Sequence, residues 1–517
     1  MSDSNEAQNG RIRLQHAGNE VVQEAGHSRQ DLFFVAAVDN IAYAKRVDIL
    51  WAGRDGVWHT LPATFHSMAG DHSEYWIATA SLHLASHGAG PDAIRFALRC
   101  QMQGEEHWDN NGGANYVCPA HSYMRLGGDR AVFNLGPTQR LHDHQRTIAV
   151  SVAVHQPVRA DQVVVHWTTD DWQNVHVTPC QPRSRLERMP AGGPEEEACE
   201  IWSAVLNAGD AFRIQYSVCC ESGEQAIWDN NDFDNYSPSR KPLNVLVLNL
   251  HCRQEDDQDY KFSEIAKAID ELSVDVVCLQ EVSEDWNDAQ GDWASNSARI
   301  INDRLEKPFH IHNDWSHLGF GRYREGVAIL SRYPFSEYDS RYVSNKRDPY
   351  SIDSRKVVMG KIAVPYFGAI NVFSVHVSWW ENGFAEQFDN LHQWARSRRE
   401  TGVTGTLLCG DFNVAAGSPG YARIVAAQDY DDQFLAVHAP ATFAAVFRER
   451  KPGWQSLLAN DGRIDFAFLE KSSALKVTSA RQVFTGTEYA EVSDHQGVLL
   501  TFEPASVLLG KRNTGDQ

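Results

Sequence analysis

The sequence predicts a multidomain protein in which two all-β sandwich modules precede an α/β sandwich. The first observation is a repeat, because WDNNGGANY at 108–116 returns as WDNNDFDNY at 228–236, each time after a strand-like run. The second is a change near residue 243, where strand and helix patterns begin to alternate. A chain of 517 residues is also too long for one ordinary core.

Each copy of the repeat is rich in short alternating strands and turn residues, which favours a β-sandwich. A second pair of similar segments lies upstream of the two copies, VDILWAGRDGVWHTLPATF before the first and VVVHWTTDDWQNVHVTP before the second. We expect the domains to be an N-terminal segment at 1–30, partly disordered, a first module at 31–118, a linker at 119–146 and a second module at 147–238.

The sequence after PSRKP, residues 238–242, predicts a single α/β domain at 243–504, followed by a tail at 505–517. Buried strands are expected at 243–251, 274–282, 326–330, 369–376, 406–409, 464–469 and 496–502, and helices at 261–272, 293–305 and 384–399.

Composition excludes some classes of protein. The net charge is −21 and both halves are acidic, which makes long nucleic acid an unlikely partner. The chain has no apolar run long enough for a transmembrane segment and does not begin like a signal peptide, so we expect a cytoplasmic protein. Nine scattered cysteines favour reduced thiols, with a Cys100–Cys118 disulfide as the alternative.

Polar residues stand at or near the C-terminal ends of the predicted strands of the α/β domain. Alone, each has an ordinary role in a turn, but an α/β sheet gathers its functional groups at that edge. Several carboxylates buried together need a cation, and oxygen ligands favour Mg²⁺ or Mn²⁺. The candidate residues are Asn249, Glu281, His376, Asp411, Asn413, Asp465, Asp494 and His495.

Residues 243–503 resemble the endonuclease/exonuclease/phosphatase superfamily, also called DNase I-like, whose motifs occur here in the family's order. They are LNLH, LQEV, REGVAILSRYP, SRKVVMGKI, VFSVHVS, GDFN, RIDFAF and SDH. The resemblance implies a four-layered α/β sandwich and hydrolysis of a phosphoester by water, with no covalent enzyme intermediate.

The resemblance also implies roles for the candidate residues. Glu281 is the expected main metal ligand, assisted by Asn249 and Asp494. His495, oriented by Asp465, is the expected general base. The remaining roles are positioning of water by Asp411, phosphate contacts by Asn413 and His376, and a phosphate clamp at Arg355. His251 stands where some relatives carry an acidic ligand for a second metal ion, which argues against a two-metal mechanism.

The two WDNN segments resemble carbohydrate-binding module family 21, whose starch- and glycogen-binding domains are immunoglobulin-like β-sandwiches. Indole rings stack on glucose, and asparagine amides bond its hydroxyls. The expected sites are Trp108, Asn110, Asn111, Asn115 and Tyr116 in the first module, and Trp228, Asn230, Asn231, Asn235 and Tyr236 in the second. The alternative is a core tryptophan followed by a structural Asx turn.

The sequence therefore predicts a Mg²⁺-dependent phosphatase or phosphodiesterase that its modules tether to an α-glucan such as glycogen or starch. Two alternatives remain: a DNase I-like nuclease or lipid or inositol phosphodiesterase, and an inactive glucan-binding scaffold. Trp379, Trp380 and Phe384, directly after VFSVHVS, either contact a sugar or lipid headgroup or pack within a loop.

Overall fold

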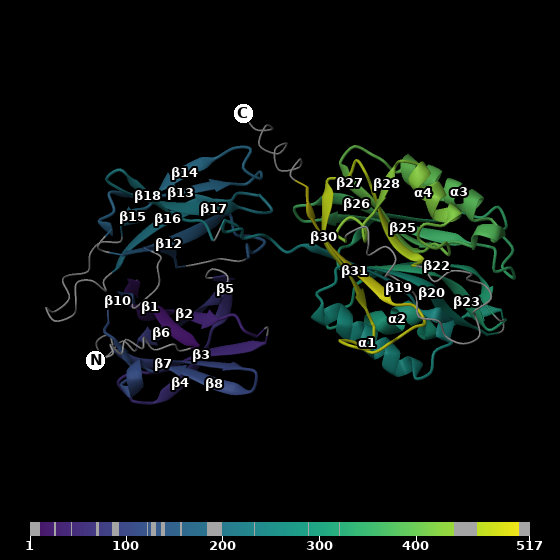
Figure 1. Cartoon of the computed structure of the whole chain (residues 1–517). Coiled ribbons are helices and arrows are strands. Elements are labelled where there is room, and N and C mark those ends of the chain that lie inside the picture. Colours follow the sequence, from purple (N-terminus) through teal and green to yellow (C-terminus); the bar gives the residue numbers. More distant parts are fainter. Residues whose placement is uncertain are drawn as a thin grey trace, which may run out of the picture. The chain divides into compact units, whose positions relative to one another are not determined.

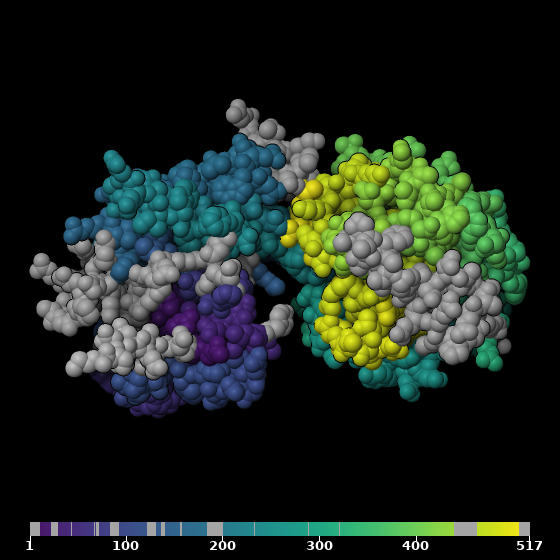
Figure 2. Space-filling model, viewed as in Figure 1, coloured from purple at the N-terminus to yellow at the C-terminus, as the bar shows by residue number. Residues whose placement is uncertain are grey.

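The computed structural model divides the chain into two compact units, Met1–Lys241 and Pro242–Gln517, which we describe separately (Figure 1). It describes residues 11–505 except 25–26, 43, 69–71, 85–92, 121, 126–130, 136–139, 156–157, 183–198, 232, 288, 320 and 439–462. These described residues are coloured in Figure 2. The expected tail 505–517 lies outside them except for Ala505.

The first module of the N-terminal unit consists of two sheets around one apolar core. One sheet has the order β10-β1-β2-β6-β5; the other has the order β4-β3-β7-β8, with β9 also paired to β7. Leu32 and Phe34 of β2 pack in this core with Ile49 of β3 and Phe96 of β7. The strands are β1 (Ile12–Glu24), β2 (His27–Asp39), β3 (Lys45–Ala52), β4 (Trp58–Pro62), β5 (Thr64–Met68), β6 (Ser73–Leu84), β7 (Ile94–Met102), β8 (Glu105–Asp109), β9 (Tyr116–Cys118) and β10 (Ser122–Arg125).

The second module repeats this arrangement with the sheets β11-β12-β16-β15 and β14-β13-β17-β18. Alternate residues of its strands, such as Ile148, Val150 and Val152, face a core of their own. The strands are β11 (Val132–Asn134), β12 (Thr147–His155), β13 (Gln162–Thr168), β14 (His176–Pro179), β15 (Gln181–Pro182), β16 (Cys199–Asn207), β17 (Gln215–Ser222) and β18 (Gln225–Asp229).

The two modules share a further apolar cluster. Val35 and Ala37, on the face of β2 opposite to its own core, pack with Phe133 of β11, Ala153 of β12 and Ile201 of β16. This explains the unbroken run FFVAAV in β2, because a strand with both faces buried has no polar alternation.

The N-terminal boundaries differ from those expected from sequence. Strand β1 (Ile12–Glu24) lies inside the segment 1–30, and β10 and β11 lie inside the linker 119–146. β1 pairs along its whole length with β2, and β11 pairs with β12, so both belong to the modules. Polar residues made β1 difficult to predict as a strand. Gln15, His16 and Asn19 suggest an exposed segment, but all three are buried.

The C-terminal unit contains two sheets that alternate with helices along the chain. Their strand orders are β22-β23-β20-β19-β31-β30 and β24-β25-β26-β27-β29-β28. Ser374 of β26 joins the sheets by accepting a hydrogen bond from Gln280 and donating one to the carbonyl of Leu279. The strands are β19 (Leu243–Asn249), β20 (Val276–Asn287), β21 (Gln290–Gly291), β22 (His310–Gly319), β23 (Tyr323–Ser331), β24 (Phe335–Tyr342), β25 (Lys356–Val364), β26 (Gly368–His376), β27 (Val403–Asp411), β28 (Tyr430–Asp432), β29 (Asp465–Glu470), β30 (Leu475–Val483) and β31 (Gly497–Pro504).

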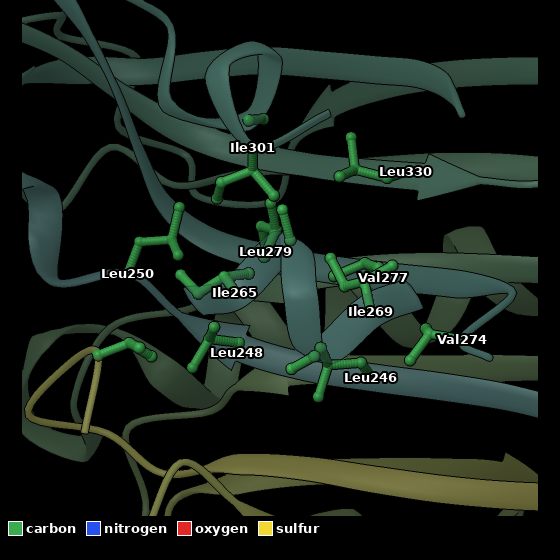
Figure 3. Close-up of a cluster of buried hydrophobic side chains, with 14 of the residues drawn as sticks. Leu246, Leu248, Leu250, Ile265, Ile269, Val274, Val277, Leu279, Ile301 and Leu330 are labelled. Carbon is green, nitrogen blue, oxygen red and sulfur yellow. The ribbon is translucent and has the colours of Figure 1, made fainter. Parts of the chain in front are cut away.

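The helices pack on these sheets through their apolar faces. Ile265 and Ile269 of α1 and Ile301 of α2 lie against Leu248 of β19 and Leu279 of β20 (Figure 3). On the other sheet, Phe388 and Leu391 of α3 and Ile424 of α4 are buried with side chains of β26 and β27. The helices are α1 (Gln258–Glu271), α2 (Ser297–Asp303), α3 (Phe384–Ser397) and α4 (Pro419–Ala426).

Two further expectations can be compared with the structure. The helix expected at 293–305 is divided into a 3₁₀ turn, Trp293–Ser295, and α2, because the side chain of Asn296 caps α2 by accepting from the backbone nitrogen of Arg299. Cys100 and Cys118 are buried free thiols, so the alternative disulfide is not formed. Among the described helices, none has the length and apolar content that crossing a membrane requires.

Candidate active site

The ends of three neighbouring strands bring the predicted residues together. Asn249 ends β19, His376 ends β26 and Asp411 ends β27. β26 and β27 are parallel, with His376 directly opposite Asp411. Gly410 makes this pairing possible: its φ is +149°, and a Cβ there would overlap the carbonyl oxygen of Val375. The glycine of GDFN is therefore a requirement of the strand pair.

Glu281 reaches this cluster through an irregularity in β20. The pairing of β20 with β23 shifts register between Leu279 and Val282, and Glu281 has a left-handed φ of +50°. A bulge of this kind re-aims a side chain at the expense of backbone strain. Burial, together with the negative charge of Glu325, raises the pKa of Glu281 to about 7.

Asn249 joins two carboxylates. Its Nδ2 donates to Oε1 of Glu281 and to Oδ2 of Asp411, both at 3.0 Å, while its Oδ1 accepts from the backbone nitrogen of His251. The amide thus turns its nitrogen, not its oxygen, toward the carboxylates. In this arrangement Asn249 positions Glu281 and Asp411, and its expected role as an assisting metal ligand stays a prediction.

His495 forms a dyad with Asp465. Its Nδ1 lies 2.8 Å from Oδ2 of Asp465, and its Nε2 lies 3.9 Å from Asp411 and 3.8 Å from Asp494. Burial and the nearby charge of Asp465 raise the pKa of Asp411 to about 7. The Asn413 backbone nitrogen donates to Oδ1 of Asp411, and its side-chain amide donates to the carbonyl of Val377. Asn413 therefore fixes the turn after Asp411.

Arg355 is buried behind His376. Its Nη1 lies 3.2 Å from Nδ1 of His376 and its Nε donates to Ser378 Oγ at 3.4 Å. Burial and the adjacent guanidinium hold the pKa of His376 well below its ordinary value, so the ring stays neutral. Glu325 lies 3.8 Å from Arg355 and 3.5 Å from His317, and its burial raises its pKa.

A second imidazole–carboxylate pair adjoins the first. His251 Nδ1 lies 2.6 Å from Oε1 of Glu255 and 3.6 Å from Oδ1 of Asp494, and Lys261 pairs with the other oxygen of Glu255. The sequence analysis did not single out Glu255 or Glu325. Glu255 could have been found from its spacing, because it follows His251 by four residues. Glu325, the glutamate of REGVAIL, is marked in the sequence only by its position at the start of an apolar strand.

The donor atoms suit a divalent cation. Ligand atoms of Glu281, His376 and Asp411 lie within 4.8 Å of one another, as do those of Asp411, Asp465 and His495 and those of His251, Glu255 and Asp494. Burial is the main cause of the raised pKa values of Glu281 and Asp411, and repulsion by the nearby carboxylates of Glu325 and Asp465 adds to it. A divalent cation relieves such repulsion, and carboxylate oxygens are the ligands Mg²⁺ and Mn²⁺ prefer. The residues present therefore fit a cation.

The WDNN loop of the first module is held by its own side chains. Asp109 accepts from the backbone nitrogen of Leu14 in β1 at 2.7 Å and from the hydroxyl of Tyr116 at 2.7 Å. Asn110 accepts from the backbone nitrogen of Gly113, and the amide of Asn111 donates to the Asn115 carbonyl. These hydrogen bonds are those of an Asx turn closing a loop.

The WDNN loop of the second module is held by equivalent hydrogen bonds. Asp229 accepts from the backbone nitrogen of Asn134 and from the hydroxyl of Tyr236, and Asn231 donates to the Asn235 carbonyl. Asn230 accepts from the backbone nitrogen of Phe233. Tyr236 is only 4% exposed, which corrects its expected place on the binding surface: its hydroxyl is needed inside by Asp229.

The tryptophans of the two motifs differ from their neighbours, because both face solvent. Trp108 is 43% exposed beneath the guanidinium of Arg99, and Trp228 is 50% exposed beside His166. The expected sets are thus divided: the asparagines and tyrosines form hydrogen bonds within the loops, and the tryptophan of each motif is exposed.

Comparison with known proteins places the C-terminal unit. Residues 246–495 match the family model described as Endonuclease/Exonuclease/phosphatase family. The uncharacterized protein YbhP of Escherichia coli K12 is 30% identical over 179 residues, 33% of this chain, and the chain spans 66% of that relative's length. Glucoamylase 1 of Rhizopus oryzae is 30% identical over 84 residues, 15% of this chain and 13% of that protein.

Two solved structures align with about half of this chain. An endonuclease/exonuclease/phosphatase family protein from Leptotrichia buccalis is 25% identical, with a TM-score of 0.44 over 50% of this chain and 99% of its own. A mannosyl-6-phosphatase of Bacteroides thetaiotaomicron is 14% identical, with a TM-score of 0.36 over the same share of each chain. On the family match, the C-terminal region of this protein is an endonuclease/exonuclease/phosphatase domain, a member of a superfamily of phosphoester hydrolases.

Proposed function

We propose that the C-terminal unit hydrolyses a phosphoester by attack of water, with His495 as the general base, and that the N-terminal modules attach it to an α-glucan such as glycogen or starch. The observation that carries the catalytic part is the His495–Asp465 dyad at 2.8 Å, whose second ring nitrogen, Nε2, faces buried carboxylates. A carboxylate behind an imidazole fixes its tautomer and raises its basicity.

Mg²⁺ or Mn²⁺ is the proposed cofactor. Glu281 is its principal ligand, Asp411 and His376 share the same space, and Asp494 contributes from the adjoining group. When bound, the cation neutralises a phosphoryl oxygen and the charge that develops on the leaving group. Asn249 keeps the Glu281 and Asp411 carboxylates in place through its two hydrogen bonds.

The other residues of the cluster bind and orient the substrate. Arg355 supplies a buried positive charge for the phosphoryl group, and neutral His376 is held against it. Asn413 contributes to phosphate binding by shaping the turn beside Asp411. Asp411 lies 3.9 Å from Nε2 of His495, which allows one water molecule to be held between them.

A panel of phosphomonoesters and phosphodiesters tests the chemistry with the full chain. We expect turnover with Mg²⁺ or Mn²⁺, loss of turnover in EDTA, and a loss of at least a hundredfold in Glu281→Gln. Glu400→Gln is the matched control, because Glu400 is an exposed glutamate that pairs with Lys361 beside the opposite end of β27. Full activity of Glu281→Gln would contradict the proposed site.

The glucan part rests on the exposed indoles of Trp108 and Trp228 and on the similarity of a short stretch to a glucoamylase. Retention of the full chain on immobilised amylose tests it. We expect Trp108→Ala and Trp228→Ala each to weaken retention and the double variant to abolish it. Trp293→Ala, an equally exposed indole of the C-terminal unit, is the control. Absence of retention of the unmodified chain rejects the tether.

A further inference from the structure

Trp380 provides an exposed indole at the edge of the candidate active site. It follows the last residue of β26, His376, by four positions and is 41% exposed. The active-site residues described above leave this side chain without a role. Its immediate surroundings show that the ring is fixed in place rather than free to turn.

The indole contacts the protein at the start of α4. A Cβ added at Gly420, the second residue of α4, would lie 3.3 Å from Cε3 of Trp380 and would overlap the side chain of Val414. The ring therefore packs on the bare backbone of α4, directly beside the GDFN turn. The ring of Phe384, which is fully buried at the start of α3, lies 6.0 Å away at a tilt and supports it further.

The backbone on both sides of Trp380 is also fixed. Ser378 receives a hydrogen bond from the Gln387 amide at its Oγ and donates one from its backbone nitrogen to the same side chain. Asn382 donates to Asp353, in the loop that precedes Arg355. Since Ser378 also accepts from Arg355, the turn that carries Trp380 is tied to the proposed phosphate clamp. β26, β27, α3 and α4 lie together in the same part of the unit (Figure 1).

We infer that Trp380 is a stacking subsite for the alcohol part of the substrate, and that this part is a hydroxyl-bearing ring such as a hexose. The inference rests on the proposed hydrolysis of a phosphoester at Glu281 and His495. A pre-positioned flat ring that is 41% exposed suits the apolar face of a sugar. It presents a single wall, whereas quaternary ammonium groups are bound in cages of several rings.

The charge beside the indole agrees with a neutral alcohol. Glu381, the next residue, is exposed and negative, in a chain with a net charge of −21. A carboxylate accepts hydrogen bonds from hydroxyl groups but repels the further phosphates of a nucleic acid strand. The Trp380 turn therefore favours one phosphate joined to a polyhydroxylated ring.

Kinetics of the full chain with Mg²⁺ on glucose 6-phosphate and glycerol 3-phosphate test the inference, because the two esters differ in the ring but share the charge. If only diesters are cleaved, the methyl diesters of the same compounds replace them. We expect Trp380→Ala to raise KM for the glucose ester about three- to tenfold, with kcat and the glycerol ester unchanged. Trp380→Phe should retain most of the preference. Tyr338→Ala, at an exposed tyrosine in the middle of β24, should change neither substrate.

Equal changes for both esters, or none, overturn the inference, as does an effect confined to phosphocholine. If the unmodified chain hydrolyses neither monoesters nor diesters, the proposed function fails. Calorimetric binding of glucose 6-phosphate and glycerol 3-phosphate then tests whether the subsite exists. The unmodified chain must bind the glucose ester more tightly, and Trp380→Ala must remove the difference. Equal affinities in the unmodified chain reject the subsite.

Discussion

His495 and Asp465 are joined by a hydrogen bond of 2.8 Å between Nδ1 and Oδ2, and both side chains are buried. Because Nδ1 is bound to the carboxylate, Nε2 is the nitrogen that can accept a proton, and it faces Asp411 and Asp494. The base, its orienting partner and these carboxylates come from three separate motifs of the sequence, SDH, RIDFAF and GDFN.

Replacement of Asp465 by asparagine tests the orienting bond. The amide can hold the imidazole but favours the wrong tautomer, so we expect kcat to fall about 10²- to 10⁴-fold with little change in KM. Asp429→Asn is the matched control, because Asp429 pairs with His392 at 2.6 Å elsewhere in the unit. Steady-state kinetics on any ester the chain cleaves measure the effect. An unchanged kcat would show that Asp465 has no part in the reaction.

Metal binding should stabilise the C-terminal unit more as pH rises. The folded pKa values of Glu281 and Asp411, about 7 each, exceed the unfolded values of about 4, so the folded state binds the extra protons. Without metal, these groups lower stability as pH increases from about 4 to 7. A cation replaces the protons in this window.

We therefore expect Mg²⁺ to raise the melting temperature over that in EDTA by little at pH 5 and by several degrees at pH 8. Differential scanning calorimetry of the full chain measures the difference at each pH. Glu281→Gln should remove most of it. A difference that is the same at pH 5 and pH 8 contradicts the assignment.

Asp229→Ala should destabilise the N-terminal unit by about 2–4 kcal/mol. The substitution removes the acceptor that binds two buried donors, the backbone nitrogen of Asn134 and the hydroxyl of Tyr236. Asp234→Ala, at an exposed residue of the same loop, should change stability by less than about 0.5 kcal/mol. Urea unfolding of the two variants gives the comparison, and equal effects would reject the anchoring role.

Arg240 should not tolerate lysine. Its guanidinium is buried and donates to five backbone carbonyls, those of Ala211, His142, Asp143, Gln145 and Gly209. An ammonium group cannot reach them all, so Arg240→Lys should cost about 3 kcal/mol or more. Arg146→Lys, in an exposed pair with Asp210, should cost less than about 1 kcal/mol. Thermal unfolding distinguishes the two, and a small effect at Arg240 would contradict this reading.

The active-site cluster could be predicted because its members stand at the ends of apolar strands, although Asp465 begins β29 and His495 precedes β31 instead of following a strand. Glu281 after VVCLQ and Asp411 after TLLCG are separated by 130 residues and lie in different sheets, yet both follow apolar runs typical of buried strands. Sequence periodicity carries that information. It does not carry the direction of an amide, so the hydrogen bonds that Asn249 Nδ2 donates to both carboxylates could not be predicted.

The N-terminal unit was harder to predict for two physical reasons. β1 contains buried polar residues such as Gln15 and Asn19, so its pattern resembles a polar segment until its partners are known. The asparagines of the WDNN motifs suit both sugar binding and turn formation. The hydrogen bonds that Asn110 and Asn111 form inside the loop indicate turn formation, and the sequence does not contain this information.

The central claim is that a phosphoester is hydrolysed by this cluster with His495 as base, and single-turnover rates of product release test it most directly. With Mg²⁺ present, the unmodified chain and His392→Ala should release product at the same rate. His495→Ala should be slower by at least a hundredfold. Equal rates for His495→Ala and the unmodified chain would contradict the claim.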